Sequence, residues 1–335
     1  MIIPPDEPRA ATADSVPEPS AEYSRQDGNG LSDDLAVSPT EQRNRRTLDI
    51  DVLPTLGVLQ LLNAEDATVP AAVERVLGPL ALVVDEAADR LRRGGRVHYF
   101  GAGSSGRIAM LDATELVPTF AIEHGMVVAH LAGGDDAMVR AVEGAEDDEA
   151  SGAAKASAVV GPLDVAIGLS ASGRTPYVGG ALSAASARGA FTAVITSNPD
   201  SPLKARADVA IVPETGPEVI AGSTRMKATT AMKLILNGFS TALMIRLGKT
   251  YSNLMVEVSA TNTKLRDRKM RILREATGAD QRTSDATLEV AGGDLRLAMI
   301  MLLGHVDAQA ARDALATGGG SVRGALGVLG ATRAP

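Results

Sequence analysis

The sequence predicts an α/β fold in which a parallel sheet is flanked by helices on both faces, with a small helical subdomain at the C-terminal end. Two observations carry this prediction. Short apolar runs typical of buried strands alternate with segments of helical periodicity between residues 96 and 213, and their connections are too long for hairpins. After about residue 280 the strand pattern stops, and short helical segments are separated by Gly-Gly or Gly-Gly-Gly.

Residues 1–42 are predicted to form a disordered, acidic and proline-rich tail. Residues 1–40 contain six prolines, eight Asp or Glu and two Arg, and they lack the regular spacing of apolar residues that a helix or strand needs. The chain begins Met-Ile-Ile-Pro-Pro-Asp-Glu, without the basic and then apolar order of a signal peptide. A cytoplasmic protein is therefore expected.

A domain of residues 43–275 is predicted to follow, and it begins with helices. Residues 69–95 have apolar positions at helical spacing and end in Arg-Arg-Gly-Gly, which is typical of a helix C-terminus. Five buried strands are then expected at residues 96–100, 126–132, 164–170, 191–197 and 209–213. A long helix over residues 223–247, capped by Ser223 or Thr224, comes next, and residues 276–335 form the small helical subdomain.

Composition excludes several classes of function. Aromatic residues make up only 2% of the chain, and residues 41–335 carry 33 acidic and 31 basic side chains, so a nucleic-acid partner is not expected. The chain has no cysteine and its four histidines lack the paired spacing of metal ligands, so no metal is expected. No run reaches the about 18 uncharged apolar residues of a membrane span, so no membrane partner is expected.

Two glycine- and serine-rich loops are the candidate binding site. Gly101-Ala-Gly-Ser-Ser-Gly106 matches the G-x-G-x-x-G pattern of dinucleotide sites, and Arg107 follows it. The stretch Gly168-Leu-Ser-Ala-Ser-Gly-Arg174 repeats the first Gly and the final Ser-Gly-Arg of this loop. Both loops precede a helix, whose N-terminal N–H groups and dipole attract anions. The hydroxyl donors that the two loops offer to a phosphate are Ser104, Ser105, Ser170, Ser172 and Thr175.

A phosphosugar is favoured over a dinucleotide at these loops. A nicotinamide site also needs an acidic residue at the end of the second strand, about 20 positions after the glycines. Here the second strand runs into Gly133-Gly134 before Asp135, so that pattern is incomplete. The alternative is that both loops are ordinary strand-to-helix turns whose hydroxyls cap their own helices.

Two acidic motifs follow the first loop. Glu115 belongs to Asp112-Ala-Thr-Glu on the next helix, and Glu146 belongs to the acidic run 143–149 after the second strand. Glu115 has apolar neighbours and precedes Pro118, which is predicted to end the helix; a general acid needs such surroundings to keep its proton. Two carboxyl groups in different environments can perform paired proton transfers. The alternatives are a solvated helix face for Glu115 and a solvated acidic run for residues 143–149.

Motifs spread over residues 42–275 resemble those of the N-acetylmuramic acid 6-phosphate etherase family, which belongs to the sugar isomerase (SIS) domain proteins. In order they are GAGSSGR, LDATE, PTF, LAGG, AVEGAEDD, SASGRTPYV, SNPDSP, GPEVIAGSTRMKATTAMKLILN and IRLGKTYSNLMVEVSATNTKL. The resemblance implies the SIS fold, a flavodoxin-like three-layer sandwich. It also implies a homodimer with sites near the subunit interface, and a C-terminal bundle of the ubiquitin-associated (UBA) type.

The resemblance also implies an activity. The family cleaves the D-lactyl ether of N-acetylmuramate 6-phosphate by elimination and then hydration, giving N-acetylglucosamine 6-phosphate and D-lactate, with no cofactor. The family's catalytic pair carries over onto Glu115 and Glu146, and Arg225 and Lys227 are expected near the phosphosugar. We take Glu115 as the acid that protonates the departing lactate oxygen and Glu146 as the base at C2. The resemblance further implies a role in N-acetylmuramate catabolism and peptidoglycan recycling.

The sequence departs from the family pattern at a few positions and leaves two other functions open. Ser104 replaces the usual Thr, Leu116-Val117 replaces Cys-Pro, and Thr229 stands where the family usually has Gly. None of these changes removes a catalytic group, although Thr229 could alter packing beside the Ser-Thr-Arg-Met-Lys segment. The alternatives are a non-catalytic regulatory protein that senses a phosphosugar, and an aldose–ketose isomerase, which needs no acid for a leaving group.

Overall fold

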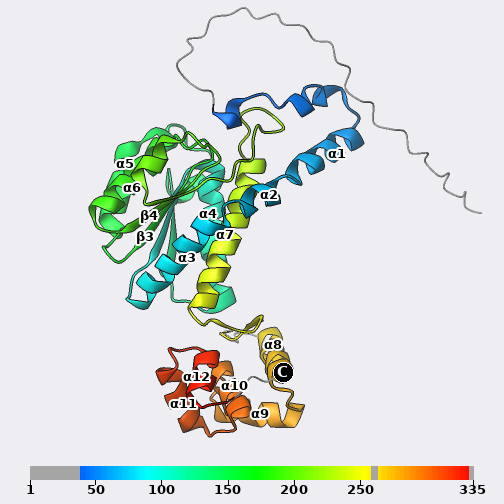
Figure 1. Cartoon of the computed structure of the whole chain (residues 1–335), viewed down its shortest axis with the longest axis vertical. Helices are drawn as coiled ribbons and strands as arrows, with labels where there is room; N and C mark the ends of the chain where they lie inside the picture. Colours follow the sequence, from blue (N-terminus) through cyan, green and yellow to red (C-terminus); the bar gives the residue numbers. More distant parts are fainter. Residues whose placement is uncertain (1–37, 258–262, 332–335) are drawn as a thin grey trace, which may run out of the picture. The chain divides into compact units, whose positions relative to one another are not determined.

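The computed structural model describes residues 38–257 and 263–331, and most of the predicted tail lies outside them (Figure 1). The described chain starts with three short 3-10 helices, η1 Pro39–Glu41, η2 Arg45–Thr47 and η3 Ile50–Val52. Residues 38–42, predicted to belong to the tail, pack against the domain. Thr40 is fully buried, and its carbonyl accepts a hydrogen bond from the N–H of Gly222 at 2.9 Å.

Five parallel strands form one sheet in the order β2-β1-β3-β4-β5, at the positions that the apolar runs predict. Their bounds are β1 Val97–Gly101, β2 Val127–Leu131, β3 Val165–Leu169, β4 Phe191–Ile195 and β5 Val209–Ile211. Strands β1 and β3 are buried along their whole length, as expected of a sheet covered on both faces.

Helices cover both faces of the sheet, which gives the three-layer sandwich (Figure 1). One face packs on α2, α3, α4 and α7 through a cluster that includes Tyr99, Ile167 and Phe239. The other face packs on α5 and α6 through a cluster that includes Phe100 and Leu182. The helices are α1 Thr55–Asp66, α2 Val69–Glu74, α3 Leu77–Arg92, α4 Gly103–Phe120, α5 Glu149–Val159, α6 Pro176–Ala187 and α7 Lys227–Arg246, with η4 Asp135–Met138, η5 Ala145–Asp147 and η6 Pro202–Arg206 between them.

Two helices differ from the sequence prediction because of proline. The helical segment from residue 69 breaks between α2 and α3, since Pro79 has no N–H to donate to the carbonyl of Arg75. Pro118, predicted to end its helix, instead lies inside α4, which ends at Phe120 before Ala121 with φ of 48°. The helix therefore tolerates one missing hydrogen bond to the carbonyl of Thr114.

Helix α7 is the central helix of the domain. By length and composition it could cross a membrane, but 56% of its apolar window is buried inside the protein. Helices Thr55–Glu74 and Leu77–Arg92 meet the same criterion only as a pair bent by 58°. Met232, Ile235 and Leu243 of α7 are fully buried in the core, so its apolar character is explained by packing.

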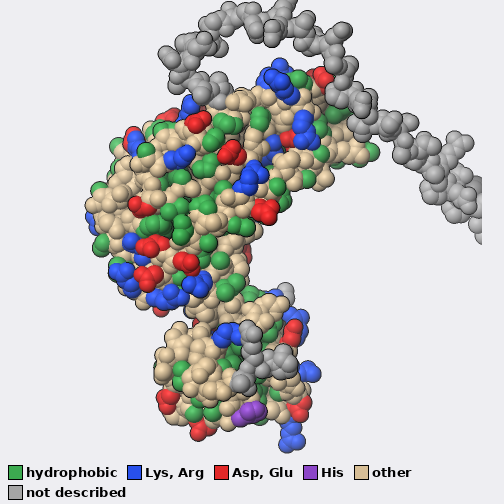
Figure 2. Space-filling view, in the orientation of Figure 1, with side chains coloured by type: hydrophobic (Ala, Val, Ile, Leu, Met, Phe, Trp, Pro, Cys, Tyr) green, Lys and Arg blue, Asp and Glu red, His purple; other side chains and the backbone are tan. Residues whose placement is uncertain are grey.

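The C-terminal part of the described chain is helical. A two-stranded hairpin, β6 Thr250–Tyr251 and β7 Leu254–Met255, leads to α8 Thr263–Thr277, α9 Gln281–Val290, α10 Leu295–Gly304, α11 Ala308–Thr317 and α12 Val322–Val328. These elements share one apolar cluster, which includes Val256 and Leu273 as well as later residues. On the face shown in Figure 2, acidic and basic side chains are intermixed, in keeping with the near balance of charge after residue 40.

Two buried histidines lie against each other on neighbouring strands of the sheet. His98 Nδ1 on β1 lies 3.0 Å from His130 Nε2 on β2, and His98 Nε2 lies 3.3 Å from Asp164 Oδ2. Burial, the neighbouring His98 and Lys155 lower the pKa of His130 to about 4. Burial also lowers the pKa of His98, against the opposing effect of Asp164. Both imidazoles are therefore neutral in the folded chain at neutral pH.

We expect the free energy of unfolding to fall by about 2 kcal/mol between pH 7 and pH 5 because of His130. The unfolded chain binds a proton at His130 near pH 6.5 and the folded chain only near pH 4, so stability is lost as the pH drops through this window. Urea unfolding at both pH values measures the effect. The His130→Gln variant should lose most of this pH dependence, and the exposed His124→Gln control should keep it. Equal stability of the unmodified chain at pH 7 and pH 5 would contradict the assignment.

Candidate active site

The two Ser-Gly-Arg loops lie side by side at the point where the strand order reverses. β1 has β2 on one side and β3 on the other, and Gly101 at the end of β1 is the register partner of Leu169 at the end of β3. Ligands of open parallel sheets bind at the carboxyl ends of the strands, at such a reversal. The sheet therefore brings together two loops that are far apart in sequence.

The three glycines of the first loop have two different structural roles. A Cβ on Gly106 would lie 2.2 Å from Leu131 Cδ1 and 2.8 Å from the carbonyl oxygen of Gly101, so this glycine lets α4 pack closely on β1. A Cβ on Gly101 would lie 2.8 Å from the backbone of Gly106. Gly103 has φ of +51°, and an added Cβ there would meet nothing within 4 Å. Open space therefore lies above Gly103, where a ligand can approach the backbone.

Helices α4 and α6 begin at these loops without a side-chain cap. Neither N-cap side chain, Ala102 for α4 and Thr175 for α6, accepts a hydrogen bond from the first turn. By contrast, α5, which follows β2, is capped by Asp148, and the first turn of α7, which follows β5, donates to Glu218. The first-turn N–H groups of α4 and α6 are thus suited to an anion.

The structure places the five predicted hydroxyls in these two loops. They are Ser104 and Ser105 in the first and Ser170, Ser172 and Thr175 in the second. Ser105 and Ser170 are buried, and Ser170 Oγ accepts from the N–H of Gly173 at 3.0 Å and lies 2.7 Å from Thr175 Oγ1. Ser104 and Ser172 are only partly buried, so their hydroxyls are the more accessible to a ligand.

Side chains outside the predicted set support both loops. Asn198 Nδ2 donates to the carbonyl of Ser172 at 2.9 Å, and Ser201 Oγ donates to the carbonyl of Gly173 at 2.7 Å. Arg107 donates to the carbonyl of Ala137 through Nε at 3.0 Å and Nη2 at 2.8 Å. The Asn-Pro-Asp-Ser sequence after β4 marks a turn that contains Asn198 and Ser201. The loop to which these two side chains donate lies too far away in sequence to be identified from that turn.

Glu146 lines a cavity of about 370 Å³ beside the first loop. It belongs to η5 and is exposed, and the cavity wall also includes Gly103, Arg107 and Arg140. The carboxylate of Glu146 and the two guanidinium groups therefore line the same cavity as Gly103. Among the described residues, no group of three or more His, Asp or Glu side chains is arranged to hold a metal ion.

Glu115 lies on α4 and does not line this cavity in the single chain. Its side chain is exposed, whereas its neighbour Leu116 is buried with 4% of its surface exposed. The apolar residues beside it in sequence point into the core, so one chain does not supply the apolar surroundings that the sequence predicts for Glu115. The exposed Leu111, one turn before it, adds apolar surface on the same helix.

A buried carboxyl group fixes the helix that carries Glu115. Asp112 Oδ2 accepts from the hydroxyl of Tyr99 on β1 at 3.1 Å, and its Oδ1 accepts from Ser240 Oγ on α7 at 3.0 Å. Burial raises the pKa of Asp112, although both hydrogen bonds act in the opposite direction. Asp112 thereby ties α4 to both the sheet and α7, and sets the direction in which Glu115 points.

The Ser-Thr-Arg-Met-Lys segment contains two of the predicted site residues, Arg225 and Lys227. The hydrogen bonds and ion pair of Lys227 are with Glu218 and Glu65, outside the two loops. Arg225 is exposed in the connection before α7. Lys227 is the first residue of α7 and is only 3% exposed; its ammonium lies 2.7 Å from Glu65 Oε2. The predicted helix cap at Ser223 or Thr224 is wrong, because Glu218 accepts the N–H groups of Lys227 and Ala228 instead.

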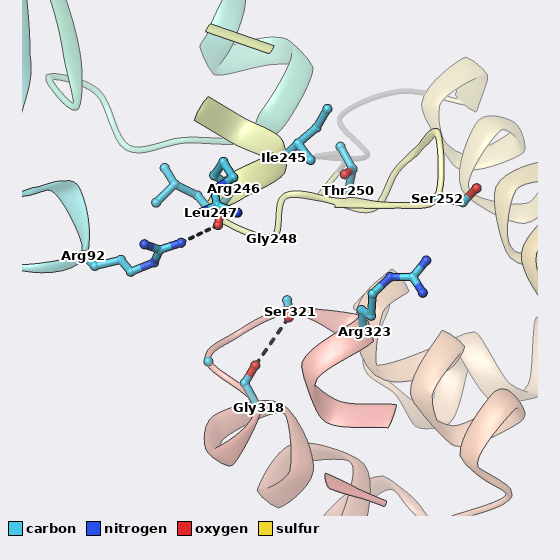
Figure 3. Close-up of a pocket in the computed structure, with 11 residues that line it drawn as sticks. Arg92, Ile245, Arg246, Leu247, Gly248, Thr250, Ser252, Gly318, Ser321 and Arg323 are labelled. Carbon is cyan, nitrogen blue, oxygen red and sulfur yellow. Dashed lines mark hydrogen bonds between the residues drawn. The ribbon is translucent and has the colours of Figure 1, made fainter. Parts of the chain in front are cut away.

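A larger cavity of about 520 Å³ lies at the other end of α7 and contains none of the predicted residues (Figure 3). Figure 3 shows Arg92 reaching the end of α7, where its Nη2 donates to the carbonyl of Arg246 at 2.6 Å. Ser321 Oγ donates to the carbonyl of Gly318 at 3.4 Å. Arg92 precedes β1, so this cavity lies at the amino edge of the sheet, opposite to the loops.

The sequence is similar to curated bacterial enzymes over most of its length. It is 58% identical over 270 residues to the N-acetylmuramic acid 6-phosphate etherase of Thermobifida fusca, an alignment that covers 81% of this chain and 88% of that protein. It is 49% identical over 299 residues to the protein of the same name from Pectobacterium atrosepticum, covering 89% of this chain and 99% of that protein.

Two family descriptions match parts of the chain, and several solved structures are similar to it. Residues 79–186 match "Glucokinase regulatory protein N-terminal SIS domain", and residues 137–237 match "SIS domain". A phosphoheptose isomerase from Francisella tularensis has a TM-score of 0.46 and 17% sequence identity, over 57% of this chain and 98% of that one.

Proposed function

This chain belongs to the family of N-acetylmuramic acid 6-phosphate etherases, and on that premise we propose how the edge of its sheet carries out the reaction. As a member of the family it is a carbon–oxygen lyase that cleaves the D-lactyl ether of N-acetylmuramate 6-phosphate. The observation that carries the proposal is the pairing of two uncapped helix N-termini, α4 and α6, at the reversal of strand order.

The phosphate of the substrate binds across these two loops. The first-turn N–H groups of α4 and α6 and the accessible hydroxyls of Ser104 and Ser172 are neutral donors suited to a phosphate monoester. Ser105, Ser170 and Thr175 complete the set, and the bond between Ser170 and Thr175 holds the second loop in shape. The open space above Gly103 lets the phosphate come close to the backbone.

The elimination needs two proton transfers, the hydration needs two more in the opposite sense, and the overall reaction involves no change of oxidation state. In the open-chain sugar the C2 proton is acidic because C2 is next to the C1 aldehyde. A base removes this proton, the C2–C3 double bond forms, and the C3–O bond breaks as the lactate oxygen receives a proton. Water then adds across the double bond, with hydroxyl at C3 and hydrogen at C2, so that the products are N-acetylglucosamine 6-phosphate and D-lactate.

Glu146 acts as the base at C2 and Glu115 as the acid on the lactate oxygen. Glu146 lines the cavity that opens above Gly103, and Arg107 and Arg140 lie in the same wall. Glu115 is exposed and lies outside this cavity. It belongs to α4, which Asp112 ties to the sheet and to α7. The exposed position of Glu115 supports a site that a second copy of the chain completes.

The active form is a cytoplasmic homodimer. Apolar side chains are exposed around the site, among them Leu111 on α4 and Met138, Val139 and Val142 after β2, and Val139 is 82% exposed. Exposed apolar surface beside a catalytic carboxyl group is expected where another subunit covers it. A partner there would supply the apolar surroundings that allow Glu115 to act as an acid.

Sedimentation equilibrium tests the dimer, which we expect at the micromolar concentrations used in assays. The Val139→Asp variant places a charge in the proposed contact and should shift the chain toward the monomer, with a parallel loss of D-lactate release. A matched change at an exposed apolar residue of the C-terminal helices, Val328→Asp, should leave both unchanged. A fully active monomer would contradict the proposal.

The Ser104→Ala variant tests the phosphate site. We expect its KM for N-acetylmuramate 6-phosphate to rise about tenfold, since one hydrogen bond to a charged group is lost, with a smaller change in kcat. Inorganic phosphate should inhibit the unmodified enzyme more strongly than this variant. The exposed Ser186→Ala on α6 is the matched control and should keep the original KM. An unchanged KM in Ser104→Ala would argue that Ser104 does not contact the substrate.

A further inference from the structure

Helix α7 begins in a cluster of buried charges. Lys227, its first residue, is 3% exposed, and its Nζ donates to Glu65 Oε2 at 2.7 Å. Glu65 at the end of α1 is 2% exposed and also accepts from Asn44 Nδ2 at 2.8 Å. Its Oε1 lies 3.1 Å from Arg46 Nε. The ammonium of Lys227 thus has a buried counter-charge, which it shares with the guanidinium of Arg46.

A second buried carboxylate holds the backbone of the same turn. Glu218 is fully buried, and its two oxygens accept the N–H groups of Lys227 at 2.9 Å and Ala228 at 3.0 Å. These N–H groups form the positive end of the helix dipole, which stabilises a carboxylate. Glu218 therefore accepts the backbone N–H groups of the helix end, while the side chain of Lys227 makes its ion pair with Glu65.

The connection before α7, residues 220–226, is tied down on both sides. The N–H of Gly222 donates to the carbonyl of Thr40 at 2.9 Å, and Thr47 Oγ1 donates to the carbonyl of Val219 at 2.8 Å. From the helix side, Thr229 Oγ1 donates to the carbonyl of Thr224 at 2.8 Å. Arg225, in the middle of this connection, remains exposed. The ties hold the backbone and leave the Arg225 side chain at the surface.

This connection lies at the same edge of the sheet as the two Ser-Gly-Arg loops. The C-terminal end of α7 contacts Arg92, which precedes β1, so that end is at the amino edge. α7 has 20 residues and spans about 30 Å, whereas a five-residue strand spans about 17 Å. The start of α7 therefore lies beyond the carboxyl edge, where α4 and α6 also begin.

We propose that Lys227 and Glu65 are positioning residues that hold the 220–226 connection, and that Arg225 is the residue of this segment that contacts an anionic group of the substrate. The inference rests on the function proposed above. Lys227 could reach a ligand only by giving up its buried ion pair with Glu65, which would leave Arg46, whose side chain is 60% exposed, as the remaining cation beside that buried carboxylate; this is unfavourable. Arg225 meets no such obstacle, because it is exposed at the carboxyl edge of the sheet.

A second substitution, at Glu65, distinguishes a positioning role of Lys227 from direct contact between Lys227 and the substrate. Lys227→Met removes the buried partner of Glu65 and leaves only the more exposed Arg46 beside that carboxylate, so we expect a lower melting temperature and a kcat/KM reduced about 100-fold. Adding Glu65→Gln removes the buried charge that has lost this partner and keeps an acceptor for Asn44. The double variant should recover the melting temperature and reach a kcat/KM within about fivefold of the original chain. A double variant that regains its melting temperature but keeps a strongly raised KM would overturn the inference, because a lost substrate contact cannot be repaired at Glu65.

Arg225→Ala gives a second readout that does not depend on folding of the Lys227 variant. We expect its KM for N-acetylmuramate 6-phosphate to rise at least about tenfold with an unchanged melting temperature. An unchanged KM would overturn the role of Arg225. The matched control is Arg93→Gln, which breaks an exposed pair with Asp89 at 3.2 Å and should change neither quantity. An unmodified chain that releases no D-lactate would overturn the proposed function, whereas an active chain whose double variant is not repaired overturns only this inference.

Discussion

Replacing Glu115 with Gln is expected to lower the rate of D-lactate release by about 100-fold to 10,000-fold, while exchange of the C2 proton continues. The amide cannot protonate the departing lactate oxygen, so the C3–O bond does not break at a useful rate. Removal of the C2 proton by Glu146 precedes this step and does not require Glu115. The substitution keeps the size of the side chain, and Glu115 is exposed, so the fold should be unaffected.

Two measurements on this variant separate the steps. Enzymatic detection of D-lactate follows bond cleavage, and incubation in D2O with proton NMR follows loss of the C2 signal. Glu123→Gln, which changes an exposed glutamate just after α4, is the matched control and should behave like the original chain. Full lactate release by Glu115→Gln would remove Glu115 from the mechanism.

Replacing Glu146 with Gln is expected to remove both C2 exchange and D-lactate release, each by about 100-fold to 10,000-fold. Without a base at C2 the double bond does not form, so the acid at C3 has no reaction to complete. The neighbouring Asp147→Asn is the control, because it removes a negative charge from the same turn without touching the proposed base. If exchange persists in Glu146→Gln and is lost in Glu115→Gln, the two roles are reversed.

The strands and the two loops could be predicted from the sequence because their signals are local. Each strand is a short buried apolar run, and each loop carries its own Gly and Ser residues. The order of the strands could not be predicted, since it depends on pairings such as Gly101 with Leu169. That pairing is what brings the two loops together at one edge, and it is a property of the folded sheet.

The start of α7 shows why other parts of the site escaped prediction. Lysine at a helix start is usually solvated, and the residue that buries it, Glu65, lies 162 positions earlier in the chain. The capping carboxylate, Glu218, lies nine positions before Lys227, outside the range of a local cap. Residues 38–47 have no apolar periodicity, yet Thr40 and Thr47 bond to the connection before α7. Each of these contacts joins segments that only tertiary structure brings together.

The environment of Glu115 differs from its sequence prediction for a similar reason. Apolar neighbours in sequence were expected to surround its carboxyl group, but on a helix they point in other directions, and Leu116 packs into the core. The proposed second subunit accounts for the difference, because it would cover α4 and the exposed apolar residues after β2.

Reaction in water labelled with oxygen-18 tests whether this chain cleaves the lactyl ether by elimination and hydration at C3. The purified chain is incubated with N-acetylmuramate 6-phosphate, and both products are examined by mass spectrometry. We expect the label to enter the C3 hydroxyl of N-acetylglucosamine 6-phosphate, because the C3–O bond is broken and water adds at C3. Label in the D-lactate hydroxyl, with none in the sugar, would contradict it.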